Sequence, residues 1–404
     1  MTNKDQECLK DYGRLLKYFY SHLVDMENKN ISKINYLPEV KVDFTNNKQG
    51  LIKINVNYNK TLSKERKKLE RHTSPYAENI LIIYIDSVSR ANSLRQLQKT
   101  MKFIEKFMNY KGGFNEKYPK EIFHSFQFFK YHSFKGNTAV NYPILFYGRS
   151  FREKQKTLIT KYMKENGYVT CNSNDFCDRD NTRMYRNYKL EEVYDHQFLI
   201  CDPNSDNNNI YTIKCLYGKQ VIEHLLEYTE QFWRLYRNNR KFVTIINNNG
   251  HEGSLTSLKY MDESMSNFLN NLFNDNLFKD STIFILSDHG VTMPSIYYLY
   301  DFYQIEGQLP MLYIIVNDRN NTYYEKQYKY IQENQQNLIT AFDIYNTLGN
   351  IIYGDKYKNL KNKKSRKDTF KSPKGISLFD KINGKKRIPI KYSDIYKIDL
   401  NVCK

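Results

Sequence analysis

Short, unbroken runs of apolar residues alternate with longer stretches of helical periodicity from about residue 79 onward. Unbroken apolar runs are typical of strands buried on both faces of a parallel sheet, and the helices between them present one apolar face to that sheet. The predicted strands are Ile80–Ile85, Gly167–Cys171, Phe242–Ile246, Thr282–Leu286 and Met311–Val316, and the clearest helices are Gln220–Tyr236 and Tyr260–Leu272. This alternation predicts an α/β protein with a three-layer α/β/α architecture and a central, mostly parallel sheet.

The first part of the chain has a different pattern. Helical periodicity over Leu9–Phe19 is followed by alternating apolar and polar residues at Val40–Phe44 and Ile52–Val56, which predict short, half-exposed strands. We therefore expect an N-terminal extension at residues 1–78, one large α/β domain at residues 79–390 and a C-terminal tail at residues 391–404.

The composition excludes two classes of protein. The chain has 36 Tyr and 24 Phe, too many aromatic residues for a disordered chain. Its longest apolar run, Ile80–Ile85, is far short of the ~18 residues that a membrane-spanning helix needs.

The net charge is +18, from 62 Lys and Arg against 44 Asp and Glu. The lysines are spread along the chain, and the densest cluster, Lys361–Lys371, is typical of a charged loop. With no nucleic-acid-binding motif beside them, they predict a solvated basic surface and no nucleic-acid partner, while an anionic substrate or proximity to a membrane stays open.

The cysteines bear on the compartment. Four of the six lie between Cys171 and Cys215, which favours an oxidising environment, and none has the spacing of a zinc site. The N-terminal residues lack the apolar segment of a signal peptide. We expect the extracellular or lumenal side of the secretory pathway, with the sequence starting downstream of a targeting segment. A cytoplasmic chain is the alternative.

Polar residues with metal-binding chemistry follow three of the predicted strands. Asp86 follows Ile80–Ile85, His251 lies shortly beyond Phe242–Ile246, and Asp288 and His289 follow Thr282–Leu286. Ligands of open α/β sheets bind beyond the carboxyl ends of the strands, so these side chains should meet at one edge. Carboxylates and imidazole together suit a divalent cation, although a single Asp after a strand is more often a helix cap.

Thr138 begins a further apolar stretch, Ala139–Tyr147. A threonine at the start of a helix gains the positive end of the helix dipole, and its hydroxyl becomes a nucleophile if a metal or a base lowers its pKa. From the local sequence alone, a capping role is the better explanation of this threonine.

These residues occur in an order that resembles the alkaline phosphatase/sulfatase superfamily, and most closely an uncharacterised sulfatase-like family of secreted or membrane-anchored eukaryotic proteins. The segments that carry the resemblance are IDSVSR (Ile85–Arg90), GNTAVNYPILFYG (Gly136–Gly148), HEGS (His251–Ser254), STIFILSDHG (Ser281–Gly290) and EGQLPMLYIIV (Glu306–Val316). Further similar segments extend it over about residues 80–380, so the resemblance implies an alkaline-phosphatase-like fold.

The resemblance also implies roles for individual residues. Asp86, Thr138, Asp288 and His289 would bind one divalent metal ion (Zn, Mn, Mg or Ca), with Thr138 as the nucleophile as well. His251 would hydrogen-bond a non-bridging oxygen or the leaving group. Contacts to the anionic phospho- or sulfo-ester substrate are expected from three further residues, Arg90, Asn141 and Asn247, although a surface or scaffold role explains Arg90 equally well.

Departures from the superfamily pattern narrow the chemistry. Sulfatases have Cys or Ser at the position of Thr138, so formylglycine chemistry is not expected. Two-metal phosphodiesterases have Asp at the position of Asn247 and a further His downstream, whereas no His follows His289. The sequence thus predicts a one-metal hydrolase or transferase acting on phosphate esters, with sulfate esters as a second possibility. The alternative is a catalytically decayed ectodomain that binds glycans or lipids.

Overall fold

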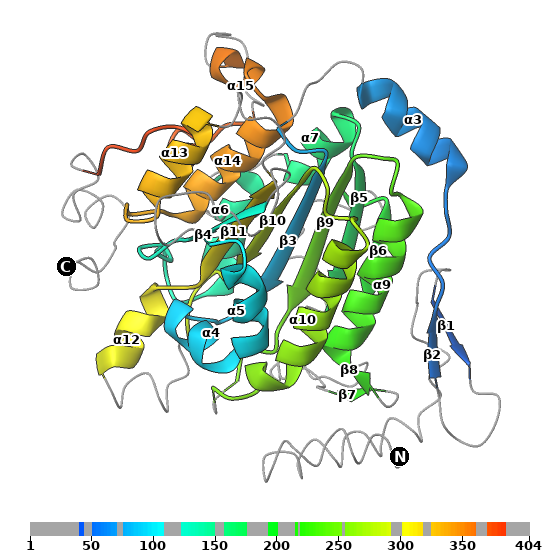
Figure 1. The fold of residues 1–404 in the computed structure, drawn as a ribbon, viewed down its shortest axis with the longest axis horizontal. Coiled ribbons are helices and arrows are strands. Elements are labelled where there is room, and N and C mark those ends of the chain that lie inside the picture. Colours follow the sequence, from blue (N-terminus) through cyan, green and yellow to red (C-terminus); the bar gives the residue numbers. More distant parts are fainter. Residues whose placement is uncertain are drawn as a thin grey trace.

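The computed structural model describes residues 40–43, 51–70, 76–108, 123–149, 157–175, 193–200, 215–216, 219–252, 255–291, 301–317, 325–360 and 370–384. At its centre is a seven-stranded sheet with the strand order β4-β11-β10-β3-β9-β5-β6 (Figure 1). In that order the strands are Phe123–Gln127, Leu312–Asn317, Ser281–Leu286, Asn79–Ile85, Lys241–Asn247, Val169–Asn174 and His196–Leu199.

The sheet is mixed but mostly parallel. Strands β10, β3, β9, β5 and β6 are parallel to one another, and β11 is antiparallel to both of its neighbours, β10 and β4. The predicted strand at Met311–Val316 therefore exists, but its assignment to the parallel set was wrong. An apolar run is the same in either direction, so burial alone does not encode strand polarity.

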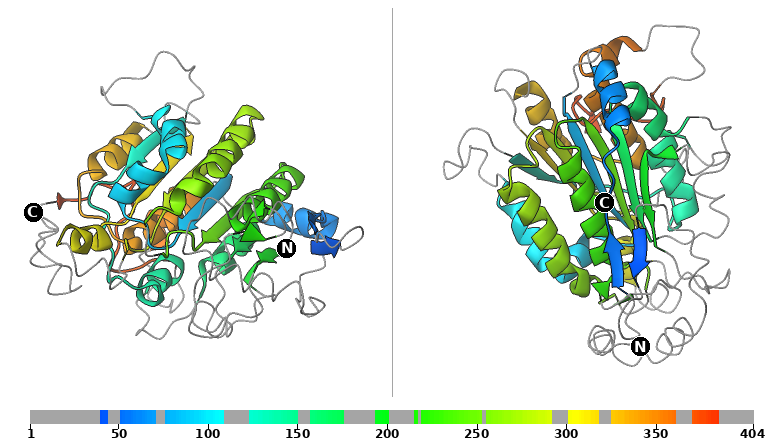
Figure 2. Two further views of the ribbon diagram at one scale, coloured as in Figure 1. Left: turned by 90° about the horizontal axis from the view of Figure 1, so that it is seen from below. Right: turned by 90° about the vertical axis from the view of Figure 1, so that its right-hand side faces the viewer.

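Helices cover both faces of the sheet (Figures 1 and 2). On one face lie α4 (Arg90–Gln96), α5 (Gln98–Glu105), α9 (Val221–Leu235) and α10 (Leu258–Asn274). On the other lie α6 (Thr138–Tyr147), α7 (Ile159–Glu165), α13 (Glu325–Asn334) and α14 (Ala341–Tyr353). The predicted three-layer α/β/α architecture is thus confirmed.

Strand β3 shows why the apolar runs are unbroken. Its residues Ile80, Ile82 and Tyr84 pack into the core under α6 and α14, and the alternate residues pack into the core under α9 and α10. Successive side chains of a strand point to opposite faces, so a strand covered on both faces needs apolar residues at every position.

The remaining described elements are β1 (Val40–Asp43), β2 (Leu51–Ile54), α3 (Lys60–Glu70), β7 (Cys215–Leu216), β8 (Lys219–Gln220), α12 (Asp301–Gln308) and α15 (Lys356–Asn359). The two strands predicted before residue 60 are confirmed as the antiparallel pair β1–β2, whereas Leu9–Phe19 lies outside the described residues. No helix in the described ranges combines the length and apolarity needed to cross a bilayer.

The end of the N-terminal segment is attached to the main domain. The Arg66 guanidinium on α3 lies 2.7 Å from Asp195 Oδ1, and Ser63 Oγ donates to Asn239 Oδ1 at 2.7 Å. The division of the chain at residue 78 stays a prediction.

Candidate functional site

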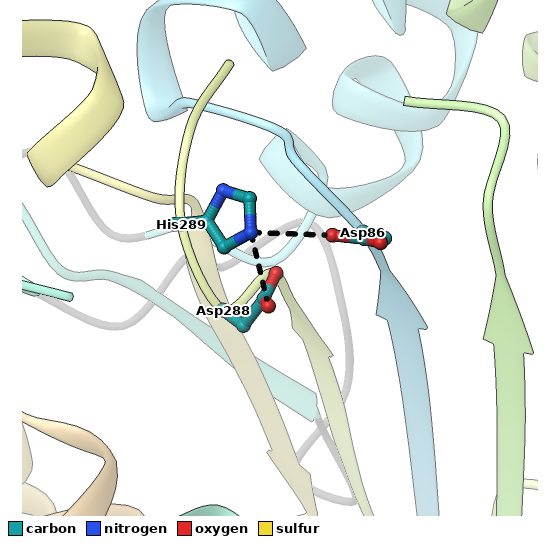
Figure 3. Close-up of side chains that lie close together, drawn as sticks. All are labelled: Asp86, Asp288 and His289. Atoms are coloured by element: carbon teal, nitrogen blue, oxygen red, sulfur yellow. Dashed lines mark ion pairs between the residues drawn. The ribbon is translucent and has the colours of Figure 1, made fainter. Parts of the chain in front are cut away.

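Three of the predicted ligands meet at the carboxyl edge of the sheet (Figure 3). Asp86 follows β3, and Asp288 and His289 follow β10, the parallel neighbour of β3. One ligand atom from each residue lies within 4.8 Å of the other two, and all three side chains are buried. The pairing of two adjacent parallel strands therefore brings together residues about 200 positions apart.

The ring of His289 is oriented for metal binding. Its Nδ1 lies 2.6 Å from the backbone oxygen of Gly290, which can only accept a hydrogen bond, so Nδ1 carries the proton. The lone pair of Nε2 then points at the carboxylates, 3.6 Å from Asp86 Oδ1 and 3.4 Å from Asp288 Oδ2 (Figure 3). A ring nitrogen that donates to a carbonyl while the other faces the ligand cluster is the usual arrangement of metal-binding histidines.

The two carboxylates and the imidazole affect one another's pKa. Burial raises the pKa of Asp288 to about 6, with Asp86 adding to the rise and His289 opposing it. Burial alone would lower the pKa of His289, but the charges of Asp288 and Asp86 outweigh it and raise that pKa. Both effects show that the site favours an additional positive charge.

Two carboxylate oxygens are also unsatisfied. Within the described part of the chain, Asp86 Oδ2 and Asp288 Oδ2 accept no hydrogen bond although both are buried. An unpaired buried oxygen is costly, and a divalent cation with oxygen and imidazole ligands would satisfy both atoms. The residues present thus fit a metal ion.

Thr138 joins the cluster from the other side of the site. It is the first residue of α6, whose cap is Asn137, with the Asn137 side chain accepting from Ala139 N at 2.9 Å. Its Oγ1 lies 3.2 Å from Asp86 Oδ1 and 3.3 Å from His289 Nε2. All four predicted metal ligands therefore lie together, and a cap other than Thr138 leaves its hydroxyl available to the site.

Close backbone contacts hold the loops that carry these residues. A Cβ on Gly250 would lie 2.2 Å from the carbonyl oxygen of Asp86, and one on Gly290 would lie 2.0 Å from that of Glu306. Both positions need glycine because the neighbouring backbone fills the space of a side chain. The close approach at Gly250 places the turn that carries His251 against the turn that carries Asp86.

The role of His251 stays a prediction. It is half-buried, and its backbone N–H donates to Asn248 O at 3.0 Å in the turn after β9.

Asn247 and Asn141 both hold loops near the site. The Asn247 amide donates to Asp175 Oδ2 at 2.7 Å, and its oxygen accepts from Asn249 N at 3.0 Å. Asn141 Oδ1 accepts from Phe134 N at 2.8 Å, and its amide donates to Asn137 O at 3.0 Å. Substrate contacts from these two residues stay predictions, because their amides already hydrogen-bond within the protein.

Arg90 begins α4, and its guanidinium lies 5.2 Å from the centre of the Phe129 ring. Such stacking holds a guanidinium in place. Its contact with substrate stays a prediction.

Asp175 is a residue of this edge that the sequence reasoning missed. It follows β5, is buried, and accepts hydrogen bonds from the Asn247 amide at 2.7 Å and from Asn248 N at 2.9 Å. The rule that drew attention to Asp86, a carboxylate directly after a buried strand, also applies to Asp175. Asp195, in contrast, accepts from Thr170 N at 2.9 Å near the beginning of β5, at the opposite edge.

Comparison with known proteins places the chain in one family. A family model described as "Protein of unknown function (DUF229)" matches residues 39–388. The match confirms the resemblance to an uncharacterised sulfatase-like family. A search of curated proteins found no match.

Solved structures of similar fold include three bacterial proteins. The C-terminal periplasmic domain of phosphoethanolamine transferase EptC from Campylobacter jejuni is 13% identical, with a TM-score of 0.45 over 70% of this chain and 93% of that one. The corresponding domain of Escherichia coli EptC in complex with Zn is 9% identical, with a TM-score of 0.49 over 70% and 84%. A protein of the alkaline phosphatase superfamily from Vibrio parahaemolyticus is 13% identical, with a TM-score of 0.44 over 74% and 76%.

Proposed function

The chain belongs to the DUF229 family, and we propose that it is a metal-dependent hydrolase or transferase that acts on phosphate esters through the hydroxyl of Thr138. The observation that carries the proposal is the position of Thr138 Oγ1, 3.2 Å from Asp86 Oδ1 and 3.3 Å from His289 Nε2, at the first residue of α6. A hydroxyl held between a carboxylate, an imidazole and a helix N-terminus is the arrangement expected of an activated nucleophile.

The metal would be one divalent ion (Zn, Mn, Mg or Ca), held by Asp86, Asp288, His289 and the Thr138 hydroxyl. Support comes from the unsatisfied Asp86 Oδ2 and Asp288 Oδ2 and from the Nδ1-protonated form of His289. When bound, such an ion supplies a Lewis acid that lowers the pKa of a coordinated hydroxyl and neutralises charge on the substrate.

The protein's own groups would then act in sequence. Asp86 Oδ1 accepts the hydroxyl proton as the bond from Thr138 Oγ1 to phosphorus forms and the ester P–O bond breaks. The N-terminal end of α6 stabilises the negative charge on the phosphoryl oxygens. His251 hydrogen-bonds the leaving group, and Arg90 binds a phosphoryl oxygen. Water, or an acceptor alcohol, then attacks the phosphorus of the phosphothreonine, the bond from phosphorus to Thr138 Oγ1 breaks, and the proton held by Asp86 returns to the Thr138 hydroxyl.

Phosphate esters are favoured over sulfate esters because Thr138 stands where sulfatases carry the residue converted to formylglycine. The assembly of Thr138 with three metal-binding side chains favours an enzyme over a binding module. We further propose a location on the extracellular or lumenal side of the secretory pathway, which is supported by the close spacing of Cys171, Cys177, Cys201 and Cys215.

The test compares wild type with Thr138→Ala and Thr138→Ser on an aryl phosphomonoester, an aryl phosphodiester and an aryl sulfate. Thr138→Ala should lose at least about 1,000-fold in kcat because removal of a nucleophile abolishes the covalent route, while Thr138→Ser, which keeps a hydroxyl, should retain measurable turnover. Undiminished turnover by Thr138→Ala would exclude Thr138 as the nucleophile. Faster turnover of the sulfate than of either phosphate would overturn the proposed reaction class.

A further inference from the structure

We propose that Ser287 is a positioning residue whose hydroxyl fixes the distance between the two halves of the metal site. One half is Asp86, carried by the turn after β3, and the other is Asp288 with His289, carried by the turn after β10. The inference rests on the proposed function, since it assigns Ser287 a role toward the metal of that site.

The Ser287 hydroxyl joins the two turns directly. Its Oγ accepts a hydrogen bond from Val88 N at 2.9 Å and donates to His289 O at 2.9 Å. Val88 lies two residues beyond Asp86, so one hydroxyl connects the backbone around the first carboxylate to the backbone of the imidazole ligand. The side chain is fully buried, so water does not compete for either bond.

The regular ladder of the sheet stops short of the ligands. The last paired residues of β3 and β10 are Tyr84 and Leu286, so the residues that bind metal lie beyond the ladder. Met311 connects the two turns in part, because its backbone N–H donates to Val88 O and its backbone oxygen accepts from Ser287 N, each at 3.0 Å. The Ser287 hydroxyl completes a triangle of hydrogen bonds between these three segments.

Electrostatics makes such a connection necessary. Asp86 and Asp288 carry like charges in a buried site, and without a cation they repel each other. Two further contacts between these turns are longer, at 3.4 Å each, from Ser87 N to Asp288 Oδ1 and from Ser87 Oγ to His289 Nδ1. A rigid connection keeps the ligands close before metal arrives, so less of the binding free energy is used to order them.

Replacement of Ser287 should therefore weaken metal binding. In Ser287→Ala, the N–H of Val88 and the C=O of His289 lose their partner inside the protein. Groups that orient metal ligands typically contribute ten- to hundredfold to metal affinity, and we expect a loss of about that size. Ser287→Thr keeps the hydroxyl and should retain most of the affinity.

The matched control is Ser281→Ala. Ser281 begins the same strand, is buried, and donates to Lys279 O at 3.2 Å at the opposite edge of the sheet. The loss of a buried hydroxyl from β10 is the same in both variants, but only one of these hydroxyls lies at the site.

The experiment is a calorimetric titration of Zn²⁺ into each metal-free full-length protein, with the melting temperature recorded in chelator. We expect Zn²⁺ binding at least about tenfold weaker in Ser287→Ala, and unchanged binding in Ser281→Ala. Binding within twofold of wild type in Ser287→Ala would overturn the positioning role. If Ser287→Ala does not fold, Ser287→Thr is compared with Ser287→Cys, whose thiol is a weak donor, and equal affinities overturn the role. A wild type that binds no divalent ion overturns the proposed function itself, and the inference with it.

Discussion

Replacement of Asp288 by Asn should stabilise the metal-free protein while it abolishes metal binding. Asp288 is buried beside Asp86, and burial with that neighbouring charge raises its pKa to about 6. The ordinary pKa of Asp is about 3.9, so the folded protein retains a proton that the unfolded chain loses between about pH 4 and pH 6. The free energy of unfolding therefore falls as the pH rises through this window.

The size of the effect follows from the pKa. One pKa unit corresponds to about 1.4 kcal/mol, so the Asp288 charge costs about 3 kcal/mol of stability at pH 7 in the absence of metal. Asn has nearly the same shape and no charge. With an unfolding entropy of about 2 cal/mol/K per residue, the gain corresponds to a melting temperature about 4 °C higher.

The assay is thermal unfolding in chelator at pH 7 and pH 4.5, and again at pH 7 with excess Zn²⁺. We expect Asp288→Asn to melt above wild type in chelator at pH 7, and the difference to shrink at pH 4.5. With Zn²⁺ the order should reverse, because only wild type gains stability from the bound ion.

The control is Asp262→Asn. The buried Asp262 carboxylate accepts from the N–H groups of Lys99 and Thr100 at 2.7 and 2.8 Å, so its replacement should lower stability under all conditions. A metal-free Asp288→Asn protein that is less stable than wild type at pH 7 would show that the buried Asp288 charge does not destabilise the fold.

Three further predictions concern stability and loop packing. Burial lowers the pKa of Lys241 to about 7, so between about pH 7 and pH 10 the unfolded chain holds a proton that the folded protein has released. The free energy of unfolding, measured in urea, should therefore rise with pH over this range by at most about 1.4 kcal/mol per pH unit, and less steeply in Lys241→Met. Gly250→Ala places a Cβ 2.2 Å from the Asp86 carbonyl oxygen, so it should lose about 1–3 kcal/mol of stability, and Zn²⁺ affinity in the same samples should fall. Asp343→Ala removes the acceptor of the Ile376 N–H at 2.7 Å and the capping box of α14, so the free energy of unfolding in urea should fall by about 3 kcal/mol. A fall below about 1 kcal/mol would contradict the stabilising role of these Asp343 hydrogen bonds.

The buried strands could be predicted from the sequence because burial on both faces leaves an unbroken apolar run, as in β3. The edge strands β4 and β6 were not predicted, since their sequences, FHSFQ and HQFL, contain polar residues. The antiparallel direction of β11 was also beyond prediction. It is set by its pairing with β10 and β4, which a local apolar pattern does not encode.

The meeting of Asp86, Asp288 and His289 was predictable because each directly follows a buried strand, and parallel strands end at one edge. The hydrogen-bond partners of Asn141 and Asn247 could not be predicted in this way. Their amides bond to the 134–137 loop and to Asp175, and such contacts depend on side-chain geometry that no residue pattern specifies. Asp175 directly follows β5, which ends at Asn174. It was missed because the sequence pattern predicted that this strand ends at residue 171, four residues earlier than Asp175.

If Thr138 is the nucleophile, it carries the phosphate group during turnover, and this covalent intermediate can be trapped. The metal-loaded protein is mixed with a fast aryl phosphate, quenched in acid within the first turnover, digested and mapped by mass spectrometry. We expect a phosphate group on Thr138 that is absent from Thr138→Ala and disappears as the substrate is exhausted. Phosphate on another residue, or steady turnover with none on Thr138, would show that Thr138 is not the nucleophile.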